Sequence, residues 1–168
     1  IDFIAKNGIV YNNAYCCLPS CCPSRQAMLT GITPEKLGAL WNFDCALPVY
    51  SITPQNDLTY SALLKNNGYT LGYVGKWHGS EKYLPADFGF DSYVSDRDYI
   101  IYRNTNYPQC KQRPIDWLNN FGGEVDNIPL NASRTHFHGQ KASELIKKFK
   151  GGKWHIRLDY NEPHLPCY

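Results

Sequence analysis

Residues 21–31 combine residue types that suit chemistry on an anion. They read Cys-Cys-Pro-Ser-Arg-Gln-Ala-Met-Leu-Thr-Gly. Because proline suits the first position of a helix, this run predicts a helix that begins near Pro23 and ends at the glycine. Cys21, just ahead of that helix, would face unpaired N–H groups and the positive end of the helix dipole, which stabilise a thiolate or an oxyanion. Arg25 lies one turn along and can bring a guanidinium to the same place.

The cysteines of this region are unusually dense. The chain has seven cysteines, and four of them fall between Cys16 and Cys22. An odd number cannot pair completely within one chain. A zinc site normally uses two separated pairs of cysteines, and neighbouring cysteines pair poorly with each other. A zinc site and a disulfide cluster both stay open as alternatives, although neither accounts for the Pro-Ser-Arg and Thr-Gly residues.

Two later segments place charged and titratable side chains just after predicted strands. Lys76 and His78 follow a strand predicted at residues 69–76, and His164 follows a strand predicted near residues 153–160. Active sites of parallel α/β sheets gather at the carboxyl ends of the strands. Taken alone, these residues fit an exposed lysine, a capping histidine and a loop histidine. Together with residues 21–31, they predict one site.

The elements that must position these residues follow from the hydrophobic pattern. Helices are predicted at residues 2–8, 23–31, 58–67 and 136–149. Strands are predicted at residues 9–11, 69–76 and 153–160, with residues 32–56 irregular and residues 79–134 mostly loop. The alternation of helices and strands predicts an α/β fold with a largely parallel sheet. His136, His138 and His155 fall inside these elements and are interpreted as structural or surface residues.

Composition limits the class of protein. The 168 residues suffice for one domain with a core, and 43% hydrophobic against 19% charged residues is a globular composition. A net charge of +2 without a strong basic block gives no reason to expect nucleic acid as a partner. No stretch approaches the roughly 18–20 apolar residues that span a bilayer. One glycosylation sequon, residues 131–133, does not fix the compartment, so periplasmic, secreted and cytoplasmic locations all stay open.

Residues 21–31 resemble the signature of the formylglycine-dependent sulfatases, Cys-x-Pro-Ser-Arg followed after four residues by Thr-Gly. Lys76-x-His78 and the Pro-His-Leu-Pro run at residues 163–166 resemble later segments of the same family. The resemblance implies an alkaline phosphatase-like sandwich with a largely parallel central sheet. It also implies that a formylglycine-generating or sulfatase-maturing enzyme oxidises Cys21 to formylglycine. The hydrated aldehyde then attacks the sulfur of a sulfate ester and releases first the alcohol and then sulfate.

The same resemblance implies roles for the other site residues. Lys76 would neutralise a sulfate oxygen, and His78 would bind the formylglycine hydroxyl and accept its proton. His164 would contact the sulfate or the leaving oxygen, and Arg25 would face the same anion. Formylglycine at position 21 would ligate a divalent cation, which in this family is usually calcium. The substrate would be a small-molecule or carbohydrate sulfate ester.

The chain departs from the family pattern in three places. It has no Asp-Asp pair, and it ends before the Asp-Asn pair and lysine that the family needs. Residues 35–38 replace a further family histidine. A hard divalent cation takes about six or more oxygen ligands, and only Cys21 is a candidate here. Residues 1–168 are therefore expected to be part of an N-terminal catalytic domain without its first strand and C-terminal part, and to be inactive and marginally folded alone.

Two other functions stay open at this point. A phosphonate monoester or phosphodiester hydrolase can use the same nucleophile, and its pocket residues overlap with those of a sulfatase. A non-catalytic binding module with a cysteine-rich loop belongs to another class. An unmodified Cys21 together with stable folding of the isolated chain would favour this second alternative, whereas an aldehyde at position 21 would exclude it.

Overall fold

The computed structural model describes residues 2–45, 49–110 and 125–164. Its helices in these ranges are α1 (Asp2–Asn7), α2 (Cys21–Thr30), α3 (Pro34–Leu37), α4 (Tyr60–Asn66), α5 (Asp96–Asn106) and α6 (Arg134–Phe149). The strands are β1 (Thr70–Gly75), β2 (Ser92–Val94) and β3 (Trp154–Asp159). Short 3-10 turns lie at Pro85–Phe88, Pro108–Cys110 and Leu130–Ala132. Pro166 and Cys167 lie outside the described residues.

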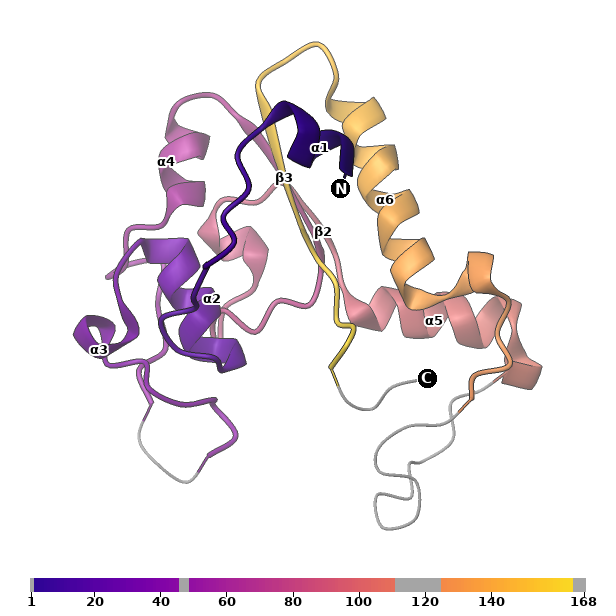
Figure 1. Cartoon of the computed structure of the whole chain (residues 1–168), viewed down its shortest axis with the longest axis horizontal. Helices are drawn as coiled ribbons and strands as arrows, with labels where there is room; N and C mark the ends of the chain where they lie inside the picture. The colour runs from indigo at the N-terminus through magenta and orange to yellow at the C-terminus, as the bar shows by residue number, and fades with distance from the viewer. Residues whose placement is uncertain (1, 46–48, 111–124, 165–168) are drawn as a thin grey trace.

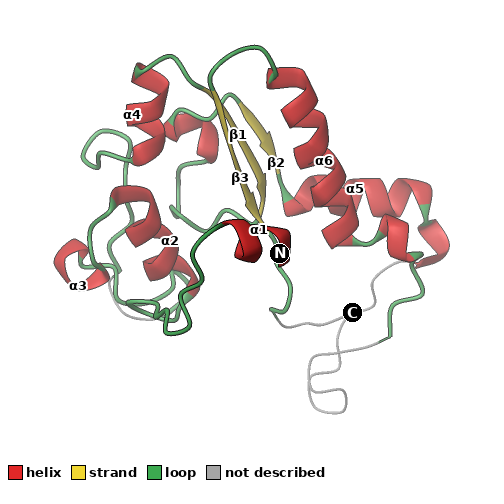
Figure 2. Cartoon of the chain, turned by 45° about the horizontal axis from the view of Figure 1, so that its top comes forward, coloured by secondary structure: helices red, strands yellow, loops and turns green. Residues whose placement is uncertain are grey.

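The described strands form a parallel sheet in the order β2-β1-β3. Helices cover both faces: α2 and α4 lie on one side of the sheet and α6 on the other (Figures 1 and 2). This arrangement confirms the predicted α/β fold with a largely parallel sheet. No helix in the described ranges combines the length and the apolar character needed to cross a membrane.

The central strand β1 is buried on both faces, as strands of a parallel sheet usually are. Leu71 and Tyr73 point into a cluster on the side of α2, which also contains Leu29, Ile52, Trp77, Phe88 and Phe90. Val74 points the other way, into a cluster with Ala142, Leu145 and Phe149 of α6. Each large apolar side chain buried in these clusters stabilises the fold by about 2 kcal/mol. Successive side chains of β1 point to opposite faces of the sheet, so this one strand packs against the helices on both sides.

Helix α6 is the longest described helix and the clearest amphipathic one. Ser133 caps its start by accepting a hydrogen bond from the backbone N–H of His136. The helix begins two residues before the predicted 136–149 range. His138 is fully buried, and burial lowers its pKa. His155 on β3 packs edge-to-face on Tyr60, with ring centroids 5.3 Å apart. These placements agree with the structural roles expected for the two histidines.

Two predictions of secondary structure were wrong. Residues 9–11 were predicted as a strand, but they are exposed and pair with no described strand. Their β-branched and aromatic side chains favour a strand only where a neighbouring strand is present to pack against. Residues 79–134, predicted mostly as loop, contain β2 and α5. Helix α5 begins with a capping box in which Ser95 and Asp98 bind each other's backbone N–H. Its surface is mostly polar, so the apolar periodicity that predicts a helix is missing.

Gly75 ends β1 and sets the distance between the two strand ends that carry the site. Its φ is 96°, a conformation that suits glycine, and a Cβ atom at this position would overlap the carbonyl oxygen of Asp159. The next residue, Lys76, donates its backbone N–H to that same carbonyl oxygen at 3.0 Å. A residue without a side chain is therefore required where β1 and β3 meet the cavity.

Replacing Gly75 with alanine should lower the free energy of unfolding by about 2 kcal/mol or more, because a left-handed backbone and a backbone overlap act together. Gly152→Ala is the matched control, since no atom lies within 4 Å of its added Cβ. Urea denaturation of both variants measures the effect. Equal urea midpoints for Gly75→Ala and the wild type would contradict the overlap argument.

Candidate functional site

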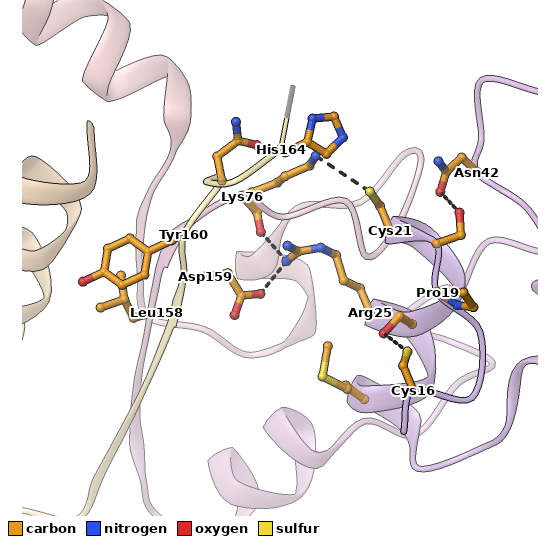
Figure 3. Close-up of a pocket in the computed structure, with 14 residues that line it drawn as sticks. Cys16, Pro19, Cys21, Arg25, Asn42, Lys76, Leu158, Asp159, Tyr160 and His164 are labelled. Atoms are coloured by element: carbon orange, nitrogen blue, oxygen red, sulfur yellow. Dashed lines mark hydrogen bonds and ion pairs between the residues drawn. The ribbon is translucent and has the colours of Figure 1, made fainter. Parts of the chain in front are cut away.

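A cavity of about 620 Å³ opens where the carboxyl ends of β1 and β3 meet the start of α2 (Figure 3). Four of the predicted site residues line it: Cys21, Arg25, Lys76 and His164. Asn42 and Asp159, which the sequence did not single out, line it as well. Side chains from three distant segments of the sequence therefore line one cavity, as the sequence predicted for these four residues.

The start of α2 is held by a residue from outside the helix. Ser20 stands at the N-cap position without a capping bond from its side chain. Instead the carboxamide oxygen of Asn42 accepts hydrogen bonds from the backbone N–H of Cys22 at 3.0 Å and from the Ser20 hydroxyl at 2.9 Å. Pro23 has no N–H to satisfy. The helix therefore begins at Cys21, two residues before the predicted start, and Cys21 is its first residue rather than the residue ahead of it.

Neighbouring cysteines of the cluster have different surroundings. Cys21 lines the cavity, where the ammonium group of Lys76 lies 3.9 Å from its sulfur. Cys22 is fully buried, and burial raises the pKa of its thiol. Because successive helical residues point about 100° apart, only the first of the pair faces the cavity. Of the pair, Cys21 is therefore the cysteine that a ligand in the cavity can reach.

The alternatives of a zinc site and a disulfide cluster find no support at these cysteines. Cys16, Cys17, Cys21 and Cys22 all carry free thiols. The sulfur of Cys16 contacts the Ser24 hydroxyl at 3.3 Å. Across residues 2–45, 49–110 and 125–164, no group of three or more metal-ligating side chains is arranged around a common point.

Arg25 reaches across the cavity to the ends of both strands (Figure 3). Its Nη1 donates to the carboxylate of Asp159 at 2.5 Å and to the carbonyl oxygen of Lys76 at 2.7 Å. The sequence predicted that Arg25 would face an anionic ligand, and the structure adds an acidic protein partner that was missed. The only local signal for Asp159 was its position at the carboxyl end of a predicted strand.

Asp159 is shared by several donors. Its Oδ2 also accepts from the Tyr73 hydroxyl at 2.6 Å and from Nε of Arg157 at 3.0 Å. Burial raises the pKa of Tyr73 far above its usual value, so this hydroxyl stays protonated and remains a donor. Two guanidinium groups thus pair with one carboxylate, and Lys76 adds a further cation to the cavity wall. The cavity therefore keeps an excess of positive charge, which suits an anionic ligand.

His78 lies beside the cavity but not in its wall. It has a positive φ of 51°, and its ring packs edge-to-face on Phe43 with centroids 6.0 Å apart. Its Nδ1 is buried without a hydrogen-bond partner. Burial lowers the pKa of His78, and the charges of Lys76 and Arg25 lower it further. The imidazole is therefore neutral at pH 7 and able to accept a proton.

Replacing Asn42 with alanine should lower the free energy of unfolding by about 1 kcal/mol, because the N–H of Cys22 loses its acceptor. Asn42→Asp keeps an acceptor oxygen and should recover most of this loss. Asn106→Ala is the matched control, since that amide donates to the Tyr102 carbonyl on the exposed side of α5. Thermal unfolding of the three variants measures the effect, and an unchanged midpoint for Asn42→Ala would show that the cap is dispensable.

Comparisons with known proteins agree on one family. A family model described as Sulfatase matches residues 1–168. The chain is 33% identical to rat steryl-sulfatase over 66% of its own length and 20% of that protein. It is 32% identical to the uncharacterized sulfatase YidJ of Escherichia coli over 99% of its own length and 33% of that protein. Human N-acetylgalactosamine-6-sulfatase is 29% identical over 88% of the chain and 31% of that protein.

A solved structure shows the same arrangement. The crystal structure of Ps i-CgsB in complex with k-i-k-neocarrahexaose superposes with a TM-score of 0.61 at 25% identity. The superposition covers 92% of this chain and 37% of that protein. The chain thus spans about a third or less of the length of these three curated relatives.

Proposed function

The chain belongs to the sulfatase family, and we propose that its cavity forms part of the active site of an enzyme that hydrolyses sulfate esters. The α/β sandwich is the alkaline phosphatase-like fold that the sequence predicted. Sulfatases generally use a formylglycine and a divalent cation. The observation that carries the proposal is the position of Cys21, the first residue of α2, beside Lys76 in a cationic cavity.

Position 21 fits a formylglycine made by a formylglycine-generating or sulfatase-maturing enzyme. Formylglycine at this position supplies a hydrated aldehyde that displaces the alcohol from sulfur and then releases sulfate. The ammonium of Lys76, 3.9 Å from the cysteine sulfur, binds a sulfate oxygen and balances the charge that develops on it. Arg25 adds a guanidinium to the same wall of the cavity. The open end of α2 contributes a positive partial charge at the same point.

The two predicted histidines serve different steps. His78 is neutral at pH 7 because burial lowers its pKa, so it accepts the proton that the hydroxyl at position 21 loses. His164 lines the cavity on the side of β3 and binds the sulfate or the leaving oxygen. The substrate is a small-molecule or carbohydrate sulfate ester. Residues 1–168 form part of the N-terminal catalytic domain of the enzyme.

A divalent cation, calcium in this proposal, does not fit the described residues alone. No cluster of three or more His, Cys, Asp or Glu side chains occurs among them. Asp159 is the carboxylate of the cavity, and its Oδ2 already accepts from three donors. A hard cation needs several oxygen ligands. No step is therefore assigned to the cation, and position 21 stays its proposed ligand.

The first prediction from this function concerns Cys21. The peptide that contains residues 18–31 of natively produced protein should carry an aldehyde at position 21, detected by mass and by hydrazide labelling. Cys21→Ala should lose the label and lower the rate of aryl sulfate hydrolysis about a thousandfold or more. Cys17→Ser, an exposed neighbour, should change neither. An intact thiol at position 21 in a host that matures other sulfatases would refute the proposal.

The second prediction concerns pH. Because the pKa of His78 lies below its usual 6.5, the neutral form persists as the pH falls from 7 and is lost only below pH 6.5. The acid limb of the pH–kcat profile should therefore lie below pH 6.5. His78→Gln should flatten this limb and lower kcat by about 10²–10⁴-fold. An acid limb that His78→Gln leaves in place would assign the titration to another group.

A further inference from the structure

Asp159 is the one acidic side chain among the described residues of the cavity wall. A carboxylate opposes the binding of an anion, so its presence beside a sulfate site requires a physical reason. Its side chain is 17% exposed and that of its partner Arg25 is 15% exposed. An ion pair this sheltered is weakly screened by solvent, so its attraction is stronger than that of an exposed pair.

The register of the sheet places the carboxylate. Tyr73 of β1 pairs with Arg157 of β3, and Gly75 pairs with Asp159 two residues further along. Residues two apart on a strand share one face, so Arg157 and Asp159 point the same way. Tyr73 and Arg157 therefore both reach Oδ2 of Asp159 from within the sheet, while Arg25 reaches it from α2.

These contacts engage one end of the Arg25 guanidinium and leave the other end open. Nη1 donates to Asp159 and to the carbonyl oxygen of Lys76. Among the described residues, the hydrogen bonds of the Arg25 side chain are all made by Nη1, which leaves Nε and Nη2 for a ligand. Because the guanidinium is planar and rigid, fixing Nη1 fixes the direction of the other N–H groups.

We propose that Asp159 is a positioning residue for sulfate ester hydrolysis, which holds Nη1 of Arg25 so that its remaining N–H groups face the sulfate at position 21. This inference rests on the proposed function. Asp159 acts through Arg25 and does not touch the substrate. Its negative charge weakens the binding of the anion, and the fixed guanidinium aids the reaction. Binding and turnover should therefore respond to its removal in opposite directions.

The test is Asp159→Asn, which keeps the shape and one acceptor oxygen but removes the charge. In the whole enzyme of which residues 1–168 form a part, with an aryl sulfate as substrate, kcat should fall about tenfold or more, because the guanidinium is no longer held. Affinity for inorganic sulfate, measured by calorimetry, should rise about tenfold as the repelling charge disappears. Asp91→Asn is the matched control, since Asp91 also forms an ion pair, in its case with Lys65, but lies outside the cavity wall. It should change neither quantity.

The variant Tyr73→Phe distinguishes the positioning of the Arg25–Asp159 pair from the charge of Asp159. It removes a hydroxyl that donates to the carboxylate and also accepts from Nη1 of Arg25 at 3.3 Å, without changing the charge of the cavity. The value of kcat should therefore fall, and sulfate affinity should stay constant. An unchanged kcat in Asp159→Asn, or sulfate binding that is equal or weaker, would overturn the inference. Failure of the proposed function looks different: the wild type would then carry no aldehyde and hydrolyse no aryl sulfate, whereas failure at Asp159 leaves wild-type activity intact.

Discussion

The ion pair between Arg25 and Asp159 ties together the parts of the molecule that make the cavity. It joins α2, which carries Cys21, to the end of β3. The same guanidinium nitrogen binds the carbonyl oxygen of Lys76 at the end of β1. Three segments that are far apart in the sequence thus meet at one charged group. Loss of Asp159 would leave Arg25 without its carboxylate in a sheltered place, whereas loss of Arg25 would leave Asp159 with Arg157 as its ion-pair partner.

Two residues outside the ion pair, Gly75 and Asn42, position the segments that approach it. On the side of β1, Gly75 permits close contact because it has no side chain. On the side of α2, Asn42 takes over a backbone N–H that the helix itself cannot satisfy. Gly75 acts through its lack of a side chain, and Asn42 acts through its carboxamide oxygen, which accepts the hydrogen bond. Together they bring Lys76 and Cys21 to the same wall of the cavity.

The sequence predicted those features whose signals are local. The helix around residues 23–31 and the strands β1 and β3 follow from nearby patterns. The general rule that sites gather at the carboxyl ends of parallel strands, together with the family resemblance, placed Cys21, Lys76 and His164 in one site. Individual contacts between distant residues, and elements that depend on such contacts, were missed or wrong. Asn42 caps a helix about 20 residues before it, and Asp159 pairs with Arg25 at a separation of 134 residues. Residues 9–11 have strand-forming side chains but no strand beside them, whereas α5 is a helix without an apolar stripe.

The convergence of Arg25, Arg157 and Tyr73 on one oxygen of Asp159 also constrains how the sequence can diverge. If Asp159 mutated first, two guanidinium groups would face each other without a counter-charge. If either arginine mutated first, the carboxylate would keep one cationic partner. Because Arg25 also serves the proposed site, viable mutational paths should begin at Arg157, and among homologues the identity of position 159 should covary with both arginines. The effect of a substitution at one of these four positions is therefore expected to depend on the residues at the other three.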